Sequence, residues 1–161
     1  MRSLTPTIGI LRNLALVVLL VAVAACSRTP ATGVGNLGPG GASPGSQQEF
    51  LVTVGDRVFF ETDSSELTPT AQATLDKQAA WLNRYTNYRV LIEGHADERG
   101  TREYNFALGG RRANVVVNYL VSRGVNPQRI TQKSFGKERP VAICNDISCW
   151  SQNRRAVTVV Q

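Results

Sequence analysis

The sequence predicts an α/β (α+β) sandwich, in which a mixed sheet carries two main helices in the order βαβαββ. Two long stretches, which begin near residues 69 and 103, have apolar side chains at helical spacing. Short runs of branched and aromatic residues lie before, between and after them. Because a strand, helix and strand in succession usually form a right-handed parallel crossover, we expect the first two strands to be parallel. The folded domain is placed at residues 49–161.

The first half of the domain is predicted to contain two strands around one helix. Aromatic and branched residues at 56–61 favour a strand. A helix should start at Thr68 and Pro69, because Thr is a good N-cap and Pro suits the first helical position. The second strand is expected at 89–92. The core face of the helix is an apolar stripe formed by Ala71, Leu75, Ala79 and Leu82.

The second half is predicted to contain one long helix and two strands. The helix should run from about residue 103 to 123, because Gly124 can cap it and Pro127 prevents its continuation. Strands are expected at 130–135 and 156–160, where branched residues recur. The sheet would then have four strands, with both helices available to cover one side.

Residues 1–25 are typical of a secretory signal peptide. Two arginines supply positive charge, and the apolar run at 14–25 is too short for a comfortable membrane span. Small residues lead directly to Cys26 and resemble the bacterial lipobox, so we expect acyl chains such as palmitate on this cysteine. Ser27 follows in place of an aspartate, which favours the outer membrane. The alternative is an ordinary signal peptide with an unrelated cysteine after it.

Residues 26–48 are interpreted as the lipidated N-terminus and a flexible linker. Gly, Pro, Ser and Thr dominate, and Val34 and Leu37 are the only large aliphatic side chains. Their apolar surface is too small to offset the entropy that ordering would cost. A coil of this length spans roughly 25 Å, so the domain could reach from a membrane into the periplasm.

The remaining cysteines, Cys144 and Cys149, are five positions apart in a polar loop at 141–155. In an oxidising periplasm we expect a disulfide that closes this loop, although geometry decides whether one forms. A zinc site would need further ligands, and His95 is the only histidine. We therefore expect no metal and no cofactor, and we interpret His95 as a residue that fixes a turn through hydrogen bonds.

The candidate site is the polar turn at residues 95–100, between the second strand and the second helix. Asp97 follows the carboxyl end of a strand, which is where ligands bind in open α/β sheets. Asn105, Leu108 and Arg112 share one helix face through their i, i+3, i+7 spacing. We expect Asp97 and Arg112 to be neighbours that could hold both charges of a zwitterion. On the residues alone, a structural ion pair or two solvated charges would explain the same pattern.

Three segments, GHADERG, YNFAL and RRANVVVNYL, resemble the OmpA-like peptidoglycan-binding domain family, and the resemblance extends over about residues 56–160. In that family the aspartate of the turn and the second arginine of the pair hold the diaminopimelate of the peptidoglycan stem peptide. By position these residues are Asp97 and Arg112. The family pattern Asn-x-x-Leu-Ser-x-x-Arg-Ala-x-x-Val departs only by a glycine for serine where it falls on Asn105, Leu108, Gly109, Arg112, Ala113 and Val116.

Two further segments extend this resemblance. Residues 60–63 are similar to the family's opening Phe-Asp-Phe-Asp with two replacements, so the ligand contact that they imply is weaker. Residues 153–155 resemble a family segment with paired arginines. Either Arg154 or Arg155 could join the peptidoglycan or partner surface, and we expect at least one of them to form a solvated entrance to the last strand.

The resemblance implies a non-catalytic lipoprotein that is anchored in the outer membrane, faces the periplasm and binds peptidoglycan non-covalently. Asp97 would accept the ammonium of diaminopimelate, Arg112 would bind its carboxylate and Asn105 would add amide hydrogen bonds, with Leu108 on the same binding face. The similar lipoproteins work with TolB, which implies TolB as a partner and a role in envelope integrity and cell division. An OmpA-like lipoprotein without a Tol partner is the first alternative.

Other functions have less support from the residues. Glu93, Asp97 and Glu98 could be the paired acids of a peptidoglycan hydrolase, but the first two lie on one turn rather than across a cleft. A stator protein of the flagellar type would keep a transmembrane helix, against which processing at Cys26 argues. The formal net charge of +6 is a mild excess, without the aromatic-interleaved basic stripe typical of nucleic-acid binding.

Overall fold

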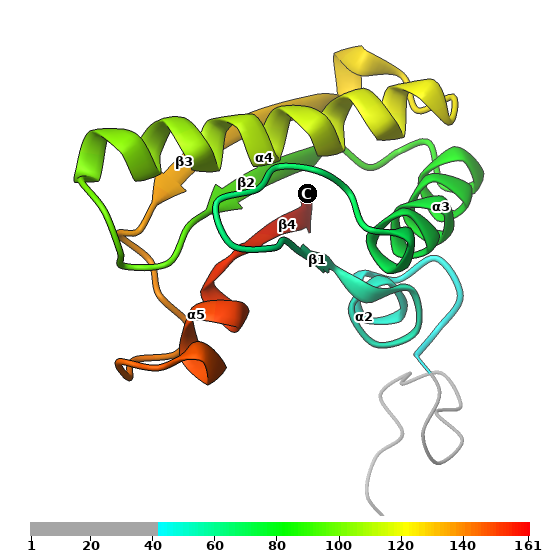
Figure 1. Ribbon diagram of the computed structural model, residues 1–161. Coiled ribbons are helices and arrows are strands. Elements are labelled where there is room, and N and C mark those ends of the chain that lie inside the picture. Colours follow the sequence, from blue (N-terminus) through cyan, green and yellow to red (C-terminus); the bar gives the residue numbers. More distant parts are fainter. Residues whose placement is uncertain (1–41) are drawn as a thin grey trace, which may run out of the picture. The chain divides into compact units, whose positions relative to one another are not determined.

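A four-stranded mixed sheet lies at the centre of the computed structural model, which describes residues 42–161 (Figure 1). In spatial order β1-β4-β2-β3, the strands are β1 (Arg57–Phe59), β4 (Arg155–Val160), β2 (Val90–His95) and β3 (Ile130–Gly136). β2 and β3 pair in parallel, whereas β4 is antiparallel to both β1 and β2. The first two strands therefore run in the same direction, as expected, but β4 lies between them. The expected signal peptide and Cys26 lie outside the described residues, as does the predicted linker up to residue 41. The last residues of that linker belong to the fold and are not a free coil, because the carbonyl of Gly45 accepts from the Tyr88 hydroxyl at 2.7 Å and a short helix begins at Gln47.

Two long helices, α3 (Pro69–Arg84) and α4 (Arg102–Ser122), correspond to the two predicted helices. Each begins at a threonine whose hydroxyl accepts a hydrogen bond from the backbone N–H three residues later, at 3.2 Å for Thr68 and 3.1 Å for Thr101. After α4 the chain turns at Gly124, which has a φ of 90° that glycine adopts without strain. The local signals in the sequence thus place both helices correctly.

Some short helical segments were not predicted. The two segments that precede β1, residues 47–55, pack on α3. There Phe50 is fully buried, and its ring lies edge-on to that of Trp81 with the ring centroids 5.0 Å apart. The carboxylate of Glu49 accepts a hydrogen bond from the Trp81 indole at 2.8 Å. The unpredicted segments are α2 (Gln47–Glu49), the π-helical turn η2 (Phe50–Gly55), the 3-10 turn η3 (Pro127–Arg129) and α5 (Ile147–Asn153).

Side chains from α3, α4 and the sheet form one hydrophobic core. All four residues of the predicted α3 stripe are buried, which confirms that stripe as core. α4 packs along β2 and β3, and α3 packs against β1 and α4. Core side chains with less than 2% of their surface exposed include Leu75, Leu82, Val90, Ile92, Val116 and Leu120.

Two glycines allow α4 to lie directly on β2. A Cβ added to Gly94 would lie 1.8 Å from the carbonyl oxygen of Gly109, and one added to Gly109 would lie 2.5 Å from Oγ of Ser134. Gly109 is the position that departs from the family pattern, and here the missing side chain permits close contact between helix and strand. This contact fixes the first half of α4 against the end of β2.

Candidate functional site

A pocket of about 260 Å³ lies between the loop after β1, the turn after β2 and the start of α4. The four residues that were predicted to form the site all line it, so the structure brings them together. The complete lining consists of Thr62, Asp63, Asp97, Arg99, Gly100, Tyr104, Asn105, Leu108 and Arg112.

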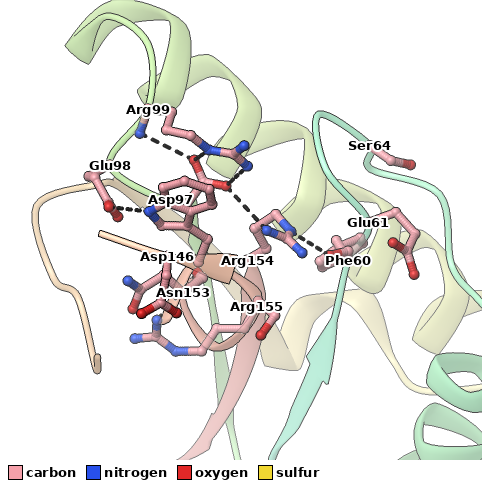
Figure 2. A network of polar contacts seen from close by, with 12 residues as sticks. Phe60, Glu61, Ser64, Asp97, Glu98, Arg99, Asp146, Asn153, Arg154 and Arg155 are labelled. Carbon is pink, nitrogen blue, oxygen red and sulfur yellow. Dashed lines mark hydrogen bonds and ion pairs between the residues drawn. The ribbon is translucent and has the colours of Figure 1, made fainter. Parts of the chain in front are cut away.

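Asp97 is 7% exposed, and its carboxylate lies between two guanidinium groups (Figure 2). Arg99 donates to Oδ2 at 2.6 Å and, through its Nε and its backbone N–H, to Oδ1 at 3.2 Å. Arg154 donates to Oδ2 at 3.4 Å, and its Nε donates to the carbonyl oxygen of Phe60 at 3.0 Å. Burial on its own would raise the pKa of Asp97, but the hydrogen bonds from both arginines outweigh it and lower the pKa. The carboxylate is therefore charged at neutral pH.

Arg112 lies beneath the pocket and has no exposed surface. Its guanidinium donates to three backbone carbonyls, those of Ser64 at 2.8 Å, His95 at 2.8 Å and Glu61 at 3.2 Å. Burial lowers the pKa of Arg112 to about 10, which still leaves it charged at neutral pH. Since a guanidinium carries five N–H groups, one on each terminal nitrogen is left over. In the part of the chain that the structure describes, no ion pair joins Arg112 directly to Asp97.

Asn105 and Leu108 are 2% and 5% exposed, on the face of α4 that meets the pocket. The amide nitrogen of Asn105, which we expected to meet a ligand, donates instead to the carbonyl oxygen of Arg99 at 2.7 Å. Lys137 supports the same turn, because its Nζ donates to the carbonyls on either side of Arg99 at 3.1 and 2.7 Å. Asn105 thus shapes the site by holding the turn that carries Asp97.

Sequence reasoning assigned no role to two residues of the pocket, Arg99 and Tyr104, and only a weak one to Asp63. Asp63 has a φ of 54°, which aspartate tolerates better than most residues, and the Tyr104 hydroxyl hydrogen-bonds to its carboxylate. The only signal for Asp63 was the partial resemblance of residues 60–63 to the family's opening segment. Arg99 is close to Asp97 in sequence, but no pattern indicates that its side chain folds back onto that carboxylate.

The expectation of a solvated entrance to the last strand was wrong for both arginines. Arg154 and Arg155 are only 5% and 4% exposed. Arg155 donates to the carbonyls of Asn153 at 3.4 Å and Arg139 at 3.2 Å, and burial lowers its pKa. The physical reason is that both guanidinium groups turn inward to distant acceptors: Arg154 to Asp97 and the carbonyl of Phe60, and Arg155 to the carbonyl of Arg139.

His95 does not fix the turn through its ring, contrary to our interpretation. The ring is 2% exposed and stacks on Phe135 with centroids 5.5 Å apart, and within residues 42–161 its two nitrogens find no hydrogen-bond partner. Burial, together with the charges of Arg155 and Arg139, lowers the pKa of His95 to about 4, even though its Nε2 lies 3.6 Å from a carboxylate oxygen of Glu93. The side chain is therefore neutral at pH 7. It is the backbone carbonyl of His95, bound by Arg112, that holds the end of β2.

A disulfide joins Cys144 to Cys149, whose Cα atoms are 5.6 Å apart. It closes the loop that leads into α5. Among the residues that the structure describes, no group of three or more His, Cys, Asp or Glu side chains is arranged to hold a metal ion. None of the helices described between residues 42 and 161 is long and apolar enough to cross a membrane.

Comparison with known proteins identifies close relatives of the whole chain. A model of the OmpA family matches residues 59–154. The peptidoglycan-associated lipoprotein of Rhizobium meliloti (strain 1021) is 61% identical over 148 residues, which cover 89% of this chain and 84% of the relative. The protein of the same name from Agrobacterium fabrum (strain C58 / ATCC 33970) is 54% identical over 165 residues, which cover 98% of this chain and 93% of the relative.

Solved structures show the same fold. The crystal structure of the peptidoglycan-associated lipoprotein from Burkholderia pseudomallei matches with a TM-score of 0.64 and 42% identity, covering 66% of this chain and 90% of that one. The C-terminal domain of Helicobacter pylori MotB matches with a TM-score of 0.62 and 20% identity, covering 66% and 84%, and at that identity the likeness concerns the fold alone. The predicted mixed α/β fold is confirmed.

Proposed function

This chain belongs to the OmpA family, among its peptidoglycan-associated lipoproteins, and on that premise we propose that it binds peptidoglycan non-covalently and ties the outer membrane to the cell wall. The relatives are a family of binding proteins and not of enzymes. The observation that carries the proposal is the pocket that contains both Asp97 and Arg112. It combines the acid and the guanidinium that the recognition of a zwitterion requires.

The proposed ligand is the free end of a diaminopimelate side chain, which has one ammonium and one carboxylate group. Asp97 is the partner for the ammonium, since its carboxylate is charged and faces the pocket. Arg112 is the partner for the carboxylate, because it lines the pocket from beneath and its positive charge favours an anion there. Leu108 supplies apolar surface for the methylene groups next to these charges.

The anchoring and the partner are further parts of this proposal. Cys26 is acylated, and the Gly- and Pro-rich segment between Cys26 and the described domain lets that domain face the periplasm from the outer membrane. The resemblance to lipoproteins that work with TolB supports TolB as a partner and a role in envelope integrity and cell division. Capture of TolB from a periplasmic extract by the full-length protein is the expected result. Failure of that capture would favour an OmpA-like lipoprotein without a Tol partner.

Co-sedimentation with purified sacculi tests the site. The full-length protein in detergent should pellet with diaminopimelate-containing sacculi, and free meso-diaminopimelate should release it. Asp97→Asn preserves the shape of the side chain and removes its charge. We expect this variant to bind at least about tenfold more weakly, because an ammonium would lose its charged partner in a buried site.

Asp76→Asn is the matched control, because Asp76 pairs with Arg123 at 2.8 Å and does not line the pocket. It should bind sacculi like the wild type. If Asp97→Asn also binds like the wild type, with unchanged circular dichroism, the site assignment is wrong. Arg112→Ala is a less suitable probe, because it would leave three backbone carbonyls without their donor and so destabilise the fold.

A further inference from the structure

The carboxylate of Asp97 has no free acceptor position in this structure. A carboxylate offers about four positions to hydrogen-bond donors. Arg99 uses three of them, through its backbone N–H, Nε and a terminal nitrogen, and Arg154 uses the fourth. An ammonium can therefore reach Asp97 only if it replaces one of these donors.

Arg99 is the donor that can be replaced. Its side chain is 40% exposed, whereas that of Arg154 is 6% exposed and is also held by the carbonyl oxygen of Phe60 at 3.0 Å. Moving Arg154 would break this second bond inside the fold, while Arg99 can turn toward solvent. An incoming ammonium would thus exchange with the side chain of Arg99.

Trp150 contacts the side chain of Arg99 and so limits its positions. The Arg99 guanidinium lies over the Trp150 ring, 4.2 Å from its centroid, and the Trp150 indole hydrogen-bonds to the carboxylate of Glu98. A guanidinium stacked on an aromatic face is attracted by the electron-rich face of the ring. Trp150 therefore contacts two neighbouring side chains of the turn, those of Glu98 and Arg99.

The segment that carries Trp150 is built to hold it in place. Cys149, the preceding residue, is bridged to Cys144, which closes the loop before α5. The Asn153 side chain accepts from the backbone N–H of Val141 at 2.9 Å and Ala142 at 3.2 Å, and donates to the carbonyl of Ala142 at 2.8 Å. The disulfide and Asn153 thus attach this loop to α5 at two points, at Cys144 and at residues 141–142.

We propose that Arg99, positioned by Trp150, gates Asp97 so that the pocket accepts an ammonium only from a ligand that also brings a carboxylate. This inference rests on the proposed function, and it names Arg99 as a specificity-determining residue and Trp150 as its positioning residue. When an ammonium takes the place of Arg99 on Asp97, the stacking keeps the displaced guanidinium beside the pocket. There it can pair with the carboxylate of the same ligand, which Arg112 attracts from beneath the pocket.

This exchange of Arg99 for an ammonium predicts which of several ligands of similar length the pocket prefers. Diaminopimelate replaces the ion pair of Arg99 with Asp97 by two new ones, so no charge is left without a partner. Cadaverine has ammonium groups and no carboxylate, so it would release Arg99 without giving it a new partner. Pimelate has carboxylates only and cannot displace Arg99 from Asp97. The pocket should therefore prefer the zwitterion to either analogue.

Competition for sacculi by meso-diaminopimelate, cadaverine and pimelate tests the proposal on full-length protein in detergent. The wild type should be released by meso-diaminopimelate at a concentration well below that needed for cadaverine. In Trp150→Ala, the preference for meso-diaminopimelate over cadaverine should fall by about two- to fivefold, because the stacking that positions Arg99 is lost. Trp150→Phe retains an aromatic face but not the indole N–H. It should restore most of the preference, a rescue that would not occur if Trp150 acted through its hydrogen bond to Glu98.

Reduction supplies a second test without any substitution. Breaking the bridge between Cys144 and Cys149 should lower the preference in the wild type and leave a Cys144→Ser, Cys149→Ser variant unaffected. Ile143→Ala is the control in the same loop, because Ile143 is 90% exposed and should leave the preference unchanged. An unchanged preference in Trp150→Ala overturns the gate, and the proposed function stands if Asp97→Asn still weakens binding to sacculi by at least about tenfold. Loss of the preference in Trp150→Phe to the same extent as in Trp150→Ala also overturns it.

Discussion

At the residue scale, the candidate site is defined by the hydrogen-bond partners of its charged side chains. The helical period and the position of a turn are local properties, so the sequence could predict that Asp97 and Arg112 line one pocket. It could not predict that Arg154, 57 positions away, reaches Asp97, or that Arg112 binds carbonyls 48 and 51 positions away. Those contacts depend on where β1 and β4 lie in the sheet, which no local pattern encodes.

His95 makes stability depend on pH. Its pKa is about 4 in the folded protein, against about 6.5 in an unfolded chain. Between these values the unfolded chain binds a proton that the folded protein does not, so stability is lost as the pH falls. From this residue alone we expect the free energy of unfolding, measured with urea, to be about 2 kcal/mol lower at pH 5 than at pH 7.

His95→Gln supplies the comparison for this pH dependence. Glutamine does not titrate, so the variant should lose most of the decline between pH 7 and pH 5, whatever its stability at pH 7. Because His95 is the only histidine of the chain, the ring protons seen by NMR report its pKa without ambiguity. A midpoint near 6.5 in the folded protein would contradict the effect of burial.

At the scale of helices and strands, long periodic patterns were interpreted correctly and short irregular segments were not. α3, α4 and the strands follow from apolar stripes, caps and branched runs that extend over enough residues to define a period. α2, η2 and α5 are too short for that, and distant contacts hold them. Phe50 packs on Trp81, and Asn153 binds the loop that precedes α5.

The contact between α4 and β2 should not tolerate a side chain at Gly94. A Cβ there would lie 1.8 Å from the carbonyl oxygen of Gly109, and backbone cannot move aside as a flexible side chain can. We expect Gly94→Ala to destabilise the domain by about 3 kcal/mol in urea unfolding. It should also weaken binding to sacculi, because α4 carries Asn105, Leu108 and Arg112 into the pocket.

Gly110→Ala is the matched control on the same helix. Its new Cβ would lie 4.0 Å from Cβ of Ser134, an ordinary contact, and alanine is the better helix former. This variant should equal the wild type or gain up to about 1 kcal/mol. Equal urea midpoints for Gly94→Ala and the wild type would show that the helix can shift freely on the strand.

At the scale of the whole molecule, the chain is proposed to be attached at two separate points. The residues that line the pocket fall between 62 and 112, inside the described domain, whereas Cys26 lies beyond the Gly- and Pro-rich linker. A segment of that composition can transmit tension between its two ends, but it does not fix the orientation of one end relative to the other. Attachment to the membrane and attachment to the wall should therefore be independent of each other.

Separation of the two attachments checks this independence. Residues 27–161 exported behind an ordinary cleavable signal peptide should leave the membrane fraction for the soluble periplasm, because no acylated cysteine remains, and should still bind sacculi with wild-type affinity. Full-length Asp97→Asn should show the opposite behaviour, remaining with the membrane and losing the sacculi. Cell fractionation followed by co-sedimentation measures both properties. If the soluble form lost affinity for isolated sacculi, the linker would have to couple the anchor to the pocket, and a passive tether would be the wrong description.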